Sequence, residues 1–413
     1  MILTNPKFIN DIQKFSNVLL MISVILDPTN TILGIKDFAF IFFIFCNINS
    51  LRFSYLFFPL SFFVVFFTSL MFGLVTKQNI EISAAFSILK SFLFLFYMFF
   101  VSAKHLNLFK VFYYVSLIMA GIEIFIYIVV LFIPFLETPI YLFMCNHDHT
   151  IMINKQRNFY GLSLVSTFYK TSPILVISEA YAIFAFFKTK QNKYVIHSAL
   201  CIFGLLCSGT RANMLSTLLI IFIIFILYNF YTKKRLLSTV LFSVPVGFCA
   251  FLLILFMLTS SETSADIKSE HIKSFFTLFS NHPFIYAFLG SGPGTRMYST
   301  GFNTFTTLTE ITYLELIKNF GLIGTSFILF LLIIPIFYIF KNKNYDIFAR
   351  TSFIIGYLAY LFIAGTNPLL IGSTGFTVIM IIYYIGTNNI IEEMGLFENK
   401  KKTTKILRII LGM

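Results

Sequence analysis

The hydrophobic positions of this chain form long blocks that are separated by short polar stretches. A helix needs roughly 20 apolar residues to cross the hydrocarbon of a bilayer, and most of the blocks reach that length. We therefore expect an all-α polytopic integral membrane protein, with residues 1–413 forming a single membrane domain. The pattern predicts about twelve transmembrane helices, of which the second and seventh are short: 14–33, 35–49, 55–75, 80–102, 107–136, 161–187, 194–208, 212–231, 236–258, 309–340, 348–366 and 370–388.

The composition agrees with a membrane protein. Of the 413 residues, 58% are apolar and only 11% are charged, whereas a soluble domain is about a quarter charged. Four of the five cysteines fall within predicted spans and only Cys145 falls in a loop, which argues against a disulfide framework. Lys7 and Lys14 precede the first apolar block and no small-residue cleavage site follows it, so we expect an uncleaved first span.

The basic residues predict an orientation. With the N-terminus inside, 19 of the 30 Lys and Arg residues fall in inside segments and 8 in outside segments. Because cytoplasmic loops carry the excess of Lys and Arg, both termini are predicted to be cytoplasmic, and the net charge of +13 does not indicate a nucleic-acid partner. Two outside connections are long, 137–160 and 259–308. The basic tail, 389–413, is predicted to be cytoplasmic, either as an amphipathic helix on the inner leaflet or as a solvated segment.

Three arginines oppose this tendency because they lie in outside segments: Arg157, Arg211 and Arg296. Arg211 and Arg157 each lie close to the predicted start of a helix, where the helix dipole disfavours a cation. A bound anion would explain them, since helix N-terminal amides and a guanidinium together make a good phosphate site. The alternative is an interfacial anchor that touches lipid headgroups.

Two outside segments carry further candidate chemistry. The loop Gly290–Arg296 is rich in glycine, which would let its backbone approach a ligand closely, although a plain turn is the alternative. Glu310 opens the tenth span, either as a general base or as part of a capping box with Thr307 as N-cap. His282 precedes Pro283 and is a candidate acid or base, with a turn residue as the alternative.

For the other titratable groups, the sequence favours ordinary structural roles. A metal site at Asp266, Glu270 and His271, or at His147 and His149, is less favoured than a solvated surface. Charged residues inside spans suggest function by default. Lys170 is predicted at mid-depth of its span, and Glu315 and Lys318 are three residues apart and expected to pair. Three others have no obvious partner: Lys90, Glu123 and Glu179.

The order of these motifs resembles that of the O-antigen polymerase and ligase superfamily. Cys207–Asn213 resembles the family's Ser-Gly-Ser-Arg turn, and Arg157 with Gly161 resembles the arginine before the preceding long span. Asn281–Gly294 is similar to the His-Pro and glycine-rich stretch of the large periplasmic loop, and Glu310–Gly324 is similar to the segment that follows it. The resemblance covers residues 157–324, whereas the first third of the chain matches only in hydropathy.

The resemblance implies a GT-C-like membrane glycosyltransferase with a helical periplasmic loop in the bacterial inner membrane. Polymerases of this family join oligosaccharide repeat units linked to undecaprenyl pyrophosphate, and they work beside a flippase and a chain-length-regulating co-polymerase. Ligases transfer the glycan to lipid A-core and usually carry His where this chain has Glu310. That departure favours the polymerase. No cofactor or metal is implied.

The resemblance also implies roles for individual residues. The three outside arginines would hold the pyrophosphate bidentately, and Glu310, or else His282, would take the proton of the acceptor hydroxyl. Lys268 or Lys273 occupies the region where relatives often have Arg at the start of the loop helix. The set expected to bind substrate is completed by Lys268, Lys273, Lys170 and Tyr313. The alternative of another class is a polysaccharide flippase or another secondary transporter, which would also have about twelve spans and intramembrane charges.

Overall fold

The computed structural model describes residues 6–148, 150–159, 162–232, 263–280, 284–309, 311–367 and 369–396. The described chain is mostly helical, and eight of its helical segments are long and apolar enough to cross a membrane. They contain α1 (Pro6–Leu26), α3 (Phe57–Val75), α4 (Ile82–Phe92) with its 3₁₀ continuation η4 (Leu93–Phe100), α5 (Leu108–Phe132), α7 (Leu175–Thr189), α9 (Arg211–Tyr231), α13 (Thr312–Lys341) and α14 (Ile347–Gly365).

Three apolar helices are shorter than a membrane span: α2 (Lys36–Asn47), α8 (Asn192–Cys207) and α15 (Ser373–Thr387). Together with the eight long segments they occupy eleven of the twelve predicted spans. The remaining one, 236–258, lies outside the described residues. The membrane character expected from hydropathy is therefore present, while the number of crossings stays a prediction.

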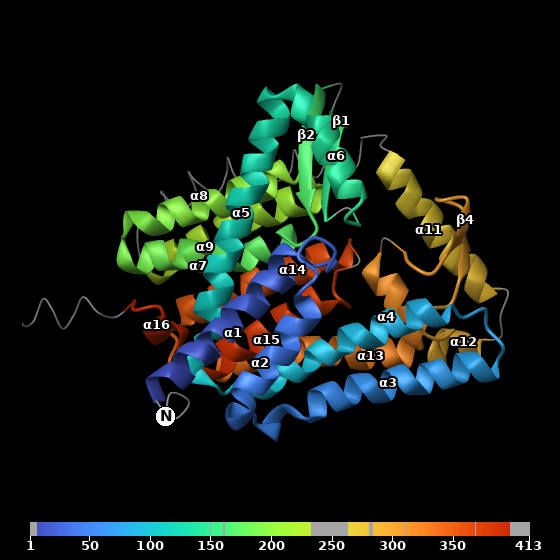
Figure 1. The fold of residues 1–413 in the computed structure, drawn as a ribbon, viewed down its shortest axis with the longest axis horizontal. Coiled ribbons are helices and arrows are strands. Elements are labelled where there is room, and N and C mark those ends of the chain that lie inside the picture. The colour runs from blue at the N-terminus through green and yellow to red at the C-terminus, as the bar shows by residue number, and fades with distance from the viewer. Residues whose placement is uncertain are drawn as a thin grey trace, which may run out of the picture.

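The connections between these helices gather at two opposite ends of the bundle (Figure 1). We call one end the loop face. It holds the connections after α1, α3, α5, α8 and α14, and also α11 (Thr263–Ser280), α12 (Ile285–Leu289), β3 (Met297–Ser299) and β4 (Thr304–Thr306). Its connections bond to one another: the Thr29 hydroxyl lies 2.7 Å from that of Thr150, and the Glu81 amide donates to Gly294 O at 2.9 Å.

The opposite end, the terminal face, holds the N-terminal end of α1, the connections after α2, η4, α7 and α13, and α16 (Ile390–Glu393). Its segments also bond to one another. Asn17 Nδ2 donates to Leu106 O at 3.1 Å, and Asn388 Nδ2 donates to Val101 O at 2.9 Å. The described connections thus alternate between the two faces as the predicted spans require, and which face is cytoplasmic stays a prediction.

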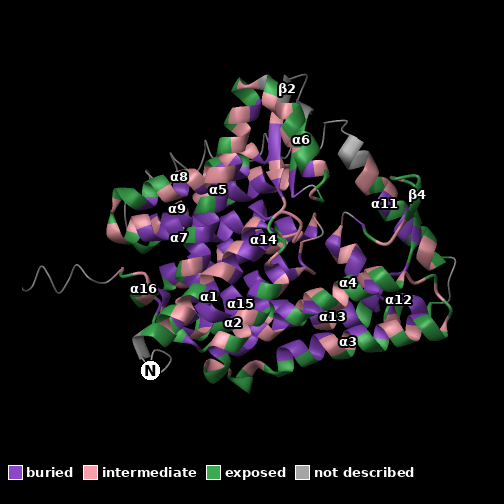
Figure 2. Ribbon diagram, viewed as in Figure 1, coloured by how far each residue is buried: buried purple, intermediate pink, exposed green. Residues whose placement is uncertain are grey.

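Among the described helices α15 is the most buried, since every residue from Ser373 to Gly386 is buried. α13, η4 and α5 pack against it, and α3 and the far end of α5 are more exposed (Figure 2). Large apolar side chains cover the perimeter, including Phe45 at 71% exposure and Phe125 at 65%. Contiguous exposed apolar surface of this kind is typical of a face that meets lipid.

The predicted span 161–187 is wrong in its first part. Residues Leu162–Tyr169 form β2, which pairs antiparallel with β1 (Ile151–Phe159), and α7 begins only after a turn that contains Pro173. β2 holds the β-branched residues Val165 and Thr167 and the aromatic residues Phe168 and Tyr169, which favour strands. The apolar residues of this strand adjoin those of α7 in the sequence, so hydropathy merged the two into one block.

The two long predicted loops contain secondary structure of their own. The first, 137–160, contains α6 (Glu137–Cys145) and β1, and the second, 259–308, contains α11, α12 and the hairpin of β3 with β4. The hairpins depart from an all-α fold. The start of the predicted tail packs against the bundle, with Ile390 and Ile391 buried, and the basic stretch from 400 to 413 lies outside the described residues.

Candidate functional site

The glycine-rich loop on the loop face is held by the backbones of three helices. Gly290, Gly292 and Gly294 have φ values of 81°, 96° and 80°, in the left-handed region that favours glycine. A Cβ on Gly290 would lie under 3.0 Å from the backbone of Gly321 in α13, and one on Gly294 under 3.0 Å from the start of α4. These glycines therefore permit close packing of the loop between helices.

Helix α13 is broken where this loop meets it. Gly321 has φ 66° and ψ −179°, which divides the helix into two segments. Such a break frees backbone carbonyls that need donors. The amide of Ser291 donates to Lys318 O at 2.7 Å, and the amide of Gly292 donates to Asn319 O at 3.2 Å. The described residues of the two sequence motifs 289–294 and 310–324 thus form one structural unit, which we call the loop–helix unit.

A buried charged network supports the loop–helix unit from within. Glu315 and Lys318 form the expected ion pair at 3.0 Å, with both side chains almost fully buried. Glu315 also accepts from the amide and hydroxyl of Thr309, at 3.0 and 3.1 Å, and from Asn319 Nδ2 at 2.9 Å. Lys318 donates to the carbonyl of Thr307. Because α13 begins at Thr312 with Ile311 as its N-cap, the capping box with Thr307 as N-cap is wrong.

Breaking this pair should destabilise the loop–helix unit. Lys318→Met would leave the Glu315 carboxylate buried without its cation, and removal of one partner of a buried pair costs about 3–5 kcal/mol. The double variant Glu315→Leu, Lys318→Met should recover part of that loss, since no unpaired charge remains. Thermal unfolding of the purified variants measures both. Equal unfolding midpoints for wild type and Lys318→Met would contradict the structural role of the pair.

Arg211 is the first residue of α9, directly after Gly209 with φ 63° and the N-cap Thr210. Two of its guanidinium nitrogens are buried. The turn before it is fixed by Asn213, whose Nδ2 donates to Ser208 Oγ at 2.8 Å and to Ser172 Oγ at 3.1 Å. Asn213 belongs to the motif recognised in the sequence, but this bonding role was not predicted.

Tyr313 and Lys268 meet the loop-face end of α14. The Tyr313 hydroxyl donates to Leu361 O at 2.8 Å, and its ring lies so close to Gly365 that a Cβ there would overlap it. Lys268 Nζ donates to Thr366 O at 3.4 Å. Because α9 packs beside α14, these two residues and Arg211 lie on elements that meet at the loop face.

The other predicted basic residues of the second long loop are paired with carboxylates. Arg296 Nε lies 2.9 Å from Glu81 Oε2 at the start of α4, and Lys273 pairs with Glu270 one turn earlier in α11. Hydrogen bonds from Arg296 and Ser83 lower the pKa of Glu81. Because the pKa is lowered, the Glu81 carboxyl is ionised at neutral pH and its ion pair with Arg296 is present there. The ion pair is lost only as the pH falls through the lowered pKa.

The remaining predicted residues lie apart from this group or outside the described residues. Lys170 follows β2 in a turn and donates to the carbonyl of Asp148, so its predicted position at mid-depth of a helix is wrong. Burial lowers the pKa of Lys170, and the Asp148 charge partly opposes that shift. Arg157 lies in β1 opposite Leu164. Glu310 and His282 lie outside the described residues.

Two side chains without a predicted partner have one in the structure. Lys90 pairs with Asp37 at 2.6 Å, and the Tyr169 amide donates to Glu123 Oε1 at 3.2 Å. Both carboxyl oxygens of Glu179 are buried and make no hydrogen bond within the described part of the chain.

His271 is fully buried, with Nδ1 3.2 Å from Ser299 Oγ and its ring 4.6 Å from that of Phe302. The expected solvated surface at His271 is therefore wrong. Within the described part of the chain, no group of three or more His, Cys, Asp and Glu side chains could hold a metal ion.

Comparison with models of known protein families, with curated proteins and with solved structures finds no match to this chain.

Proposed function

We propose that this protein polymerises a surface glycan, such as O-antigen, at the periplasmic face of the bacterial inner membrane. Its substrates would be oligosaccharide repeat units linked to undecaprenyl pyrophosphate, supplied by a flippase, with a co-polymerase setting chain length. The proposal rests first on the loop–helix unit. The segments 289–294 and 310–324 each resemble a motif of the superfamily, and Ser291 and Gly292 of the first bond to Lys318 and Asn319 of the second on the same face as the Arg211 turn.

The proposed reaction is a glycosyl transfer with a charged leaving group. A hydroxyl of the acceptor repeat attacks the anomeric carbon of the donor glycan, the bond from that carbon to the pyrophosphate oxygen breaks, and undecaprenyl pyrophosphate leaves. Glu310, or else His282, accepts the hydroxyl proton. Negative charge grows on the pyrophosphate as the bond breaks, so cations fixed beforehand at the leaving group lower the barrier.

Arg211 is the strongest candidate for that electrostatic role. Its guanidinium is partly buried at a helix N-terminus, where amide groups also favour an anion. Lys268 and Tyr313, at the adjoining end of α14, are candidates to contact the sugars or the phosphates. Arg296 would have to exchange Glu81 for the pyrophosphate, and Arg157, Lys170 and Lys273 are assigned from the sequence alone.

A deletion strain separates this proposal from its alternatives. Surface polysaccharide from the strain would be separated on a gel and compared with that of a strain that carries the gene on a plasmid. We expect lipid A-core with one repeat unit, because transfer to the core survives while polymerisation is lost. Core without any repeat would instead indicate a ligase or a flippase, and unchanged long chains would contradict all three functions.

A secondary transporter is the second candidate, and one observation favours it. Glu123 and Glu179 are fully buried in α5 and α7, and carboxyl groups inside membrane spans often serve proton-coupled transport. Glu123→Gln and Glu179→Gln discriminate between the two functions. Loss of glycan export without accumulation of single-repeat core would support transport.

A further inference from the structure

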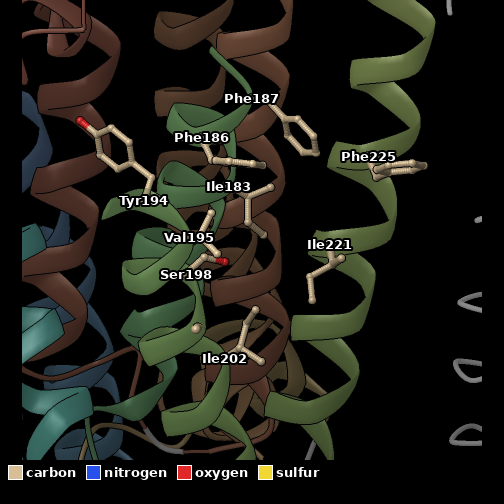
Figure 3. A pocket seen from close by; sticks show the side chains of 10 residues that line it. Ile183, Phe186, Phe187, Tyr194, Val195, Ser198, Ile202, Ile221 and Phe225 are labelled. Carbon is tan, nitrogen blue, oxygen red and sulfur yellow. The ribbon is translucent and has the colours of Figure 1, made fainter. Parts of the chain in front are cut away.

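A cavity of about 280 Å³ lies between α7, α8 and α9. This is close to the lower limit for ligand sites in proteins, about 300 Å³. The lining is apolar apart from Tyr194 and Ser198, and the side chains of Ile221 and Phe225 face those of α7 and α8 across it (Figure 3). None of the residues proposed above for glycan transfer lines this cavity.

The position of the cavity follows from the paths of the helices. A short turn at the loop face joins α8 to α9. Most of the lining residues of these helices lie in the halves farther from that turn, and Ile202 and Ile221 lie near the helix midpoints. α7 packs against both helices and contributes Ile183, Phe186 and Phe187 to the lining. The cavity is therefore on the terminal-face half of the bundle.

The ammonium groups of two lysines lie over aromatic rings that line the cavity. Lys190 Nζ lies 5.0 Å from the ring centroid of Phe187 and 5.4 Å from that of Phe186, and it donates to the Tyr228 hydroxyl at 3.0 Å. Lys193 Nζ lies 4.9 Å from the ring centroid of Tyr194. Both lysines are exposed, so their ammonium groups can meet a further anion while the rings hold them in place.

Lys190 is also fixed by its backbone. It forms the C-cap of α7 with φ 59° and ψ 23°, a left-handed conformation that glycine or asparagine usually adopts at the end of a helix. This backbone conformation fixes the direction of the Cα–Cβ bond of Lys190 at the helix end. Together with the ring contacts, this places the two cations at one edge of the cavity.

We propose that this cavity binds one acyl chain of an anionic phospholipid, whose phosphate is held by Lys190 and Lys193. The apolar lining selects a hydrocarbon chain, and the volume limits the site to about one chain. The two ammonium groups select a net negative headgroup over a zwitterionic one, because the positive group of a zwitterionic lipid would repel them. The site is independent of the proposed glycan transfer, which is placed at the loop face.

The test measures lipid binding to the purified full-length protein in detergent by native mass spectrometry, with phosphatidylglycerol and phosphatidylcholine as probes. We expect wild-type protein to retain one phosphatidylglycerol at concentrations at which phosphatidylcholine does not bind. The double variant Lys190→Asn, Lys193→Gln should bind phosphatidylglycerol about tenfold or more weakly, since each lysine near an anionic lipid contributes about a fivefold change. Asn at 190 tolerates the left-handed backbone.

A second variant tests the cavity itself. Ala199→Phe places a ring in the cavity and should also abolish retention, whereas Arg52→Gln removes an exposed cation elsewhere on the terminal face and should leave binding unchanged. Ile202→Ala enlarges the cavity and should keep binding, and thermal unfolding checks that each variant is folded. Equal retention of both lipids by the wild type, or unchanged retention in a folded Ala199→Phe protein, would overturn the proposal.

Discussion

Cells that carry Arg211→Ala are expected to lose long-chain polymer while the protein remains in the membrane. The guanidinium would no longer stabilise the leaving pyrophosphate, and removal of one such preorganised group typically lowers kcat about 100- to 1,000-fold. A rate loss of that size leaves single-repeat core as the main product. A gel of surface polysaccharide, together with an immunoblot of the membrane fraction, measures both parts of this expectation.

Two matched variants separate the role of Arg211 from the loss of a charge. Arg211→Lys keeps the cation without the planar fork that binds phosphate oxygens bidentately, so it should retain only part of the polymer. Arg350→Ala removes another half-buried arginine, at the terminal face, where its Nε donates to Asn342 O at 3.1 Å, and polymer length should be unchanged. Normal long chains in Arg211→Ala cells would refute the assignment of this arginine.

Gly321→Ala should destabilise the protein more than a Gly→Ala substitution at any other glycine of the loop–helix unit. A Cβ at this position would lie under 3.0 Å from the backbone of Phe288 and Gly290, and φ of 66° also strains an alanine. Neither backbone can move without breaking the bonds from Ser291 and Gly292 to α13. We expect a loss of about 3 kcal/mol or more, a large fraction of the stability of a typical domain.

Limited proteolysis of the loop–helix unit and the thermal unfolding midpoint together measure this effect. Gly121→Ala is the matched control, because Gly121 lies within α5 and a Cβ there meets nothing within 4 Å. It should stabilise the helix by roughly 0.5–1 kcal/mol, since glycine in a helix loses more conformational freedom than alanine. An unfolding midpoint of Gly321→Ala equal to that of wild type would show that the loop does not depend on the break in α13.

Local patterns in the sequence predicted the helices and some contacts within them. Long apolar blocks located most of the helices, because the bilayer sets their length and hydropathy. The pair of Glu315 and Lys318 was predictable, because side chains three apart on a helix are neighbours. The hairpin of β1 with β2 was missed, since the strand Leu162–Tyr169 is apolar enough to extend the hydropathy of α7.

Contacts between distant segments were not predictable from local patterns. No partner could be predicted for Lys90, because Asp37 is 53 residues away in the sequence and becomes its neighbour only when α2 packs near α4. The glycines of the loop Gly290–Arg296 signalled close approach correctly, but the approaching groups are the backbones of α3, α4 and α13. Arg296 was expected to be available for an anion and instead pairs with Glu81, 215 residues away.

Reconstitution tests the proposed polymerase most directly. The purified protein would be placed in proteoliposomes with an undecaprenyl-pyrophosphate-linked oligosaccharide repeat unit, and the products would be separated by size while released undecaprenyl pyrophosphate is quantified. We predict a ladder spaced by one repeat unit, with one undecaprenyl pyrophosphate released for each bond formed and no ladder from Arg211→Ala protein. Folded wild-type protein that leaves the repeat units unjoined, or that only moves them across the bilayer, would contradict the proposal.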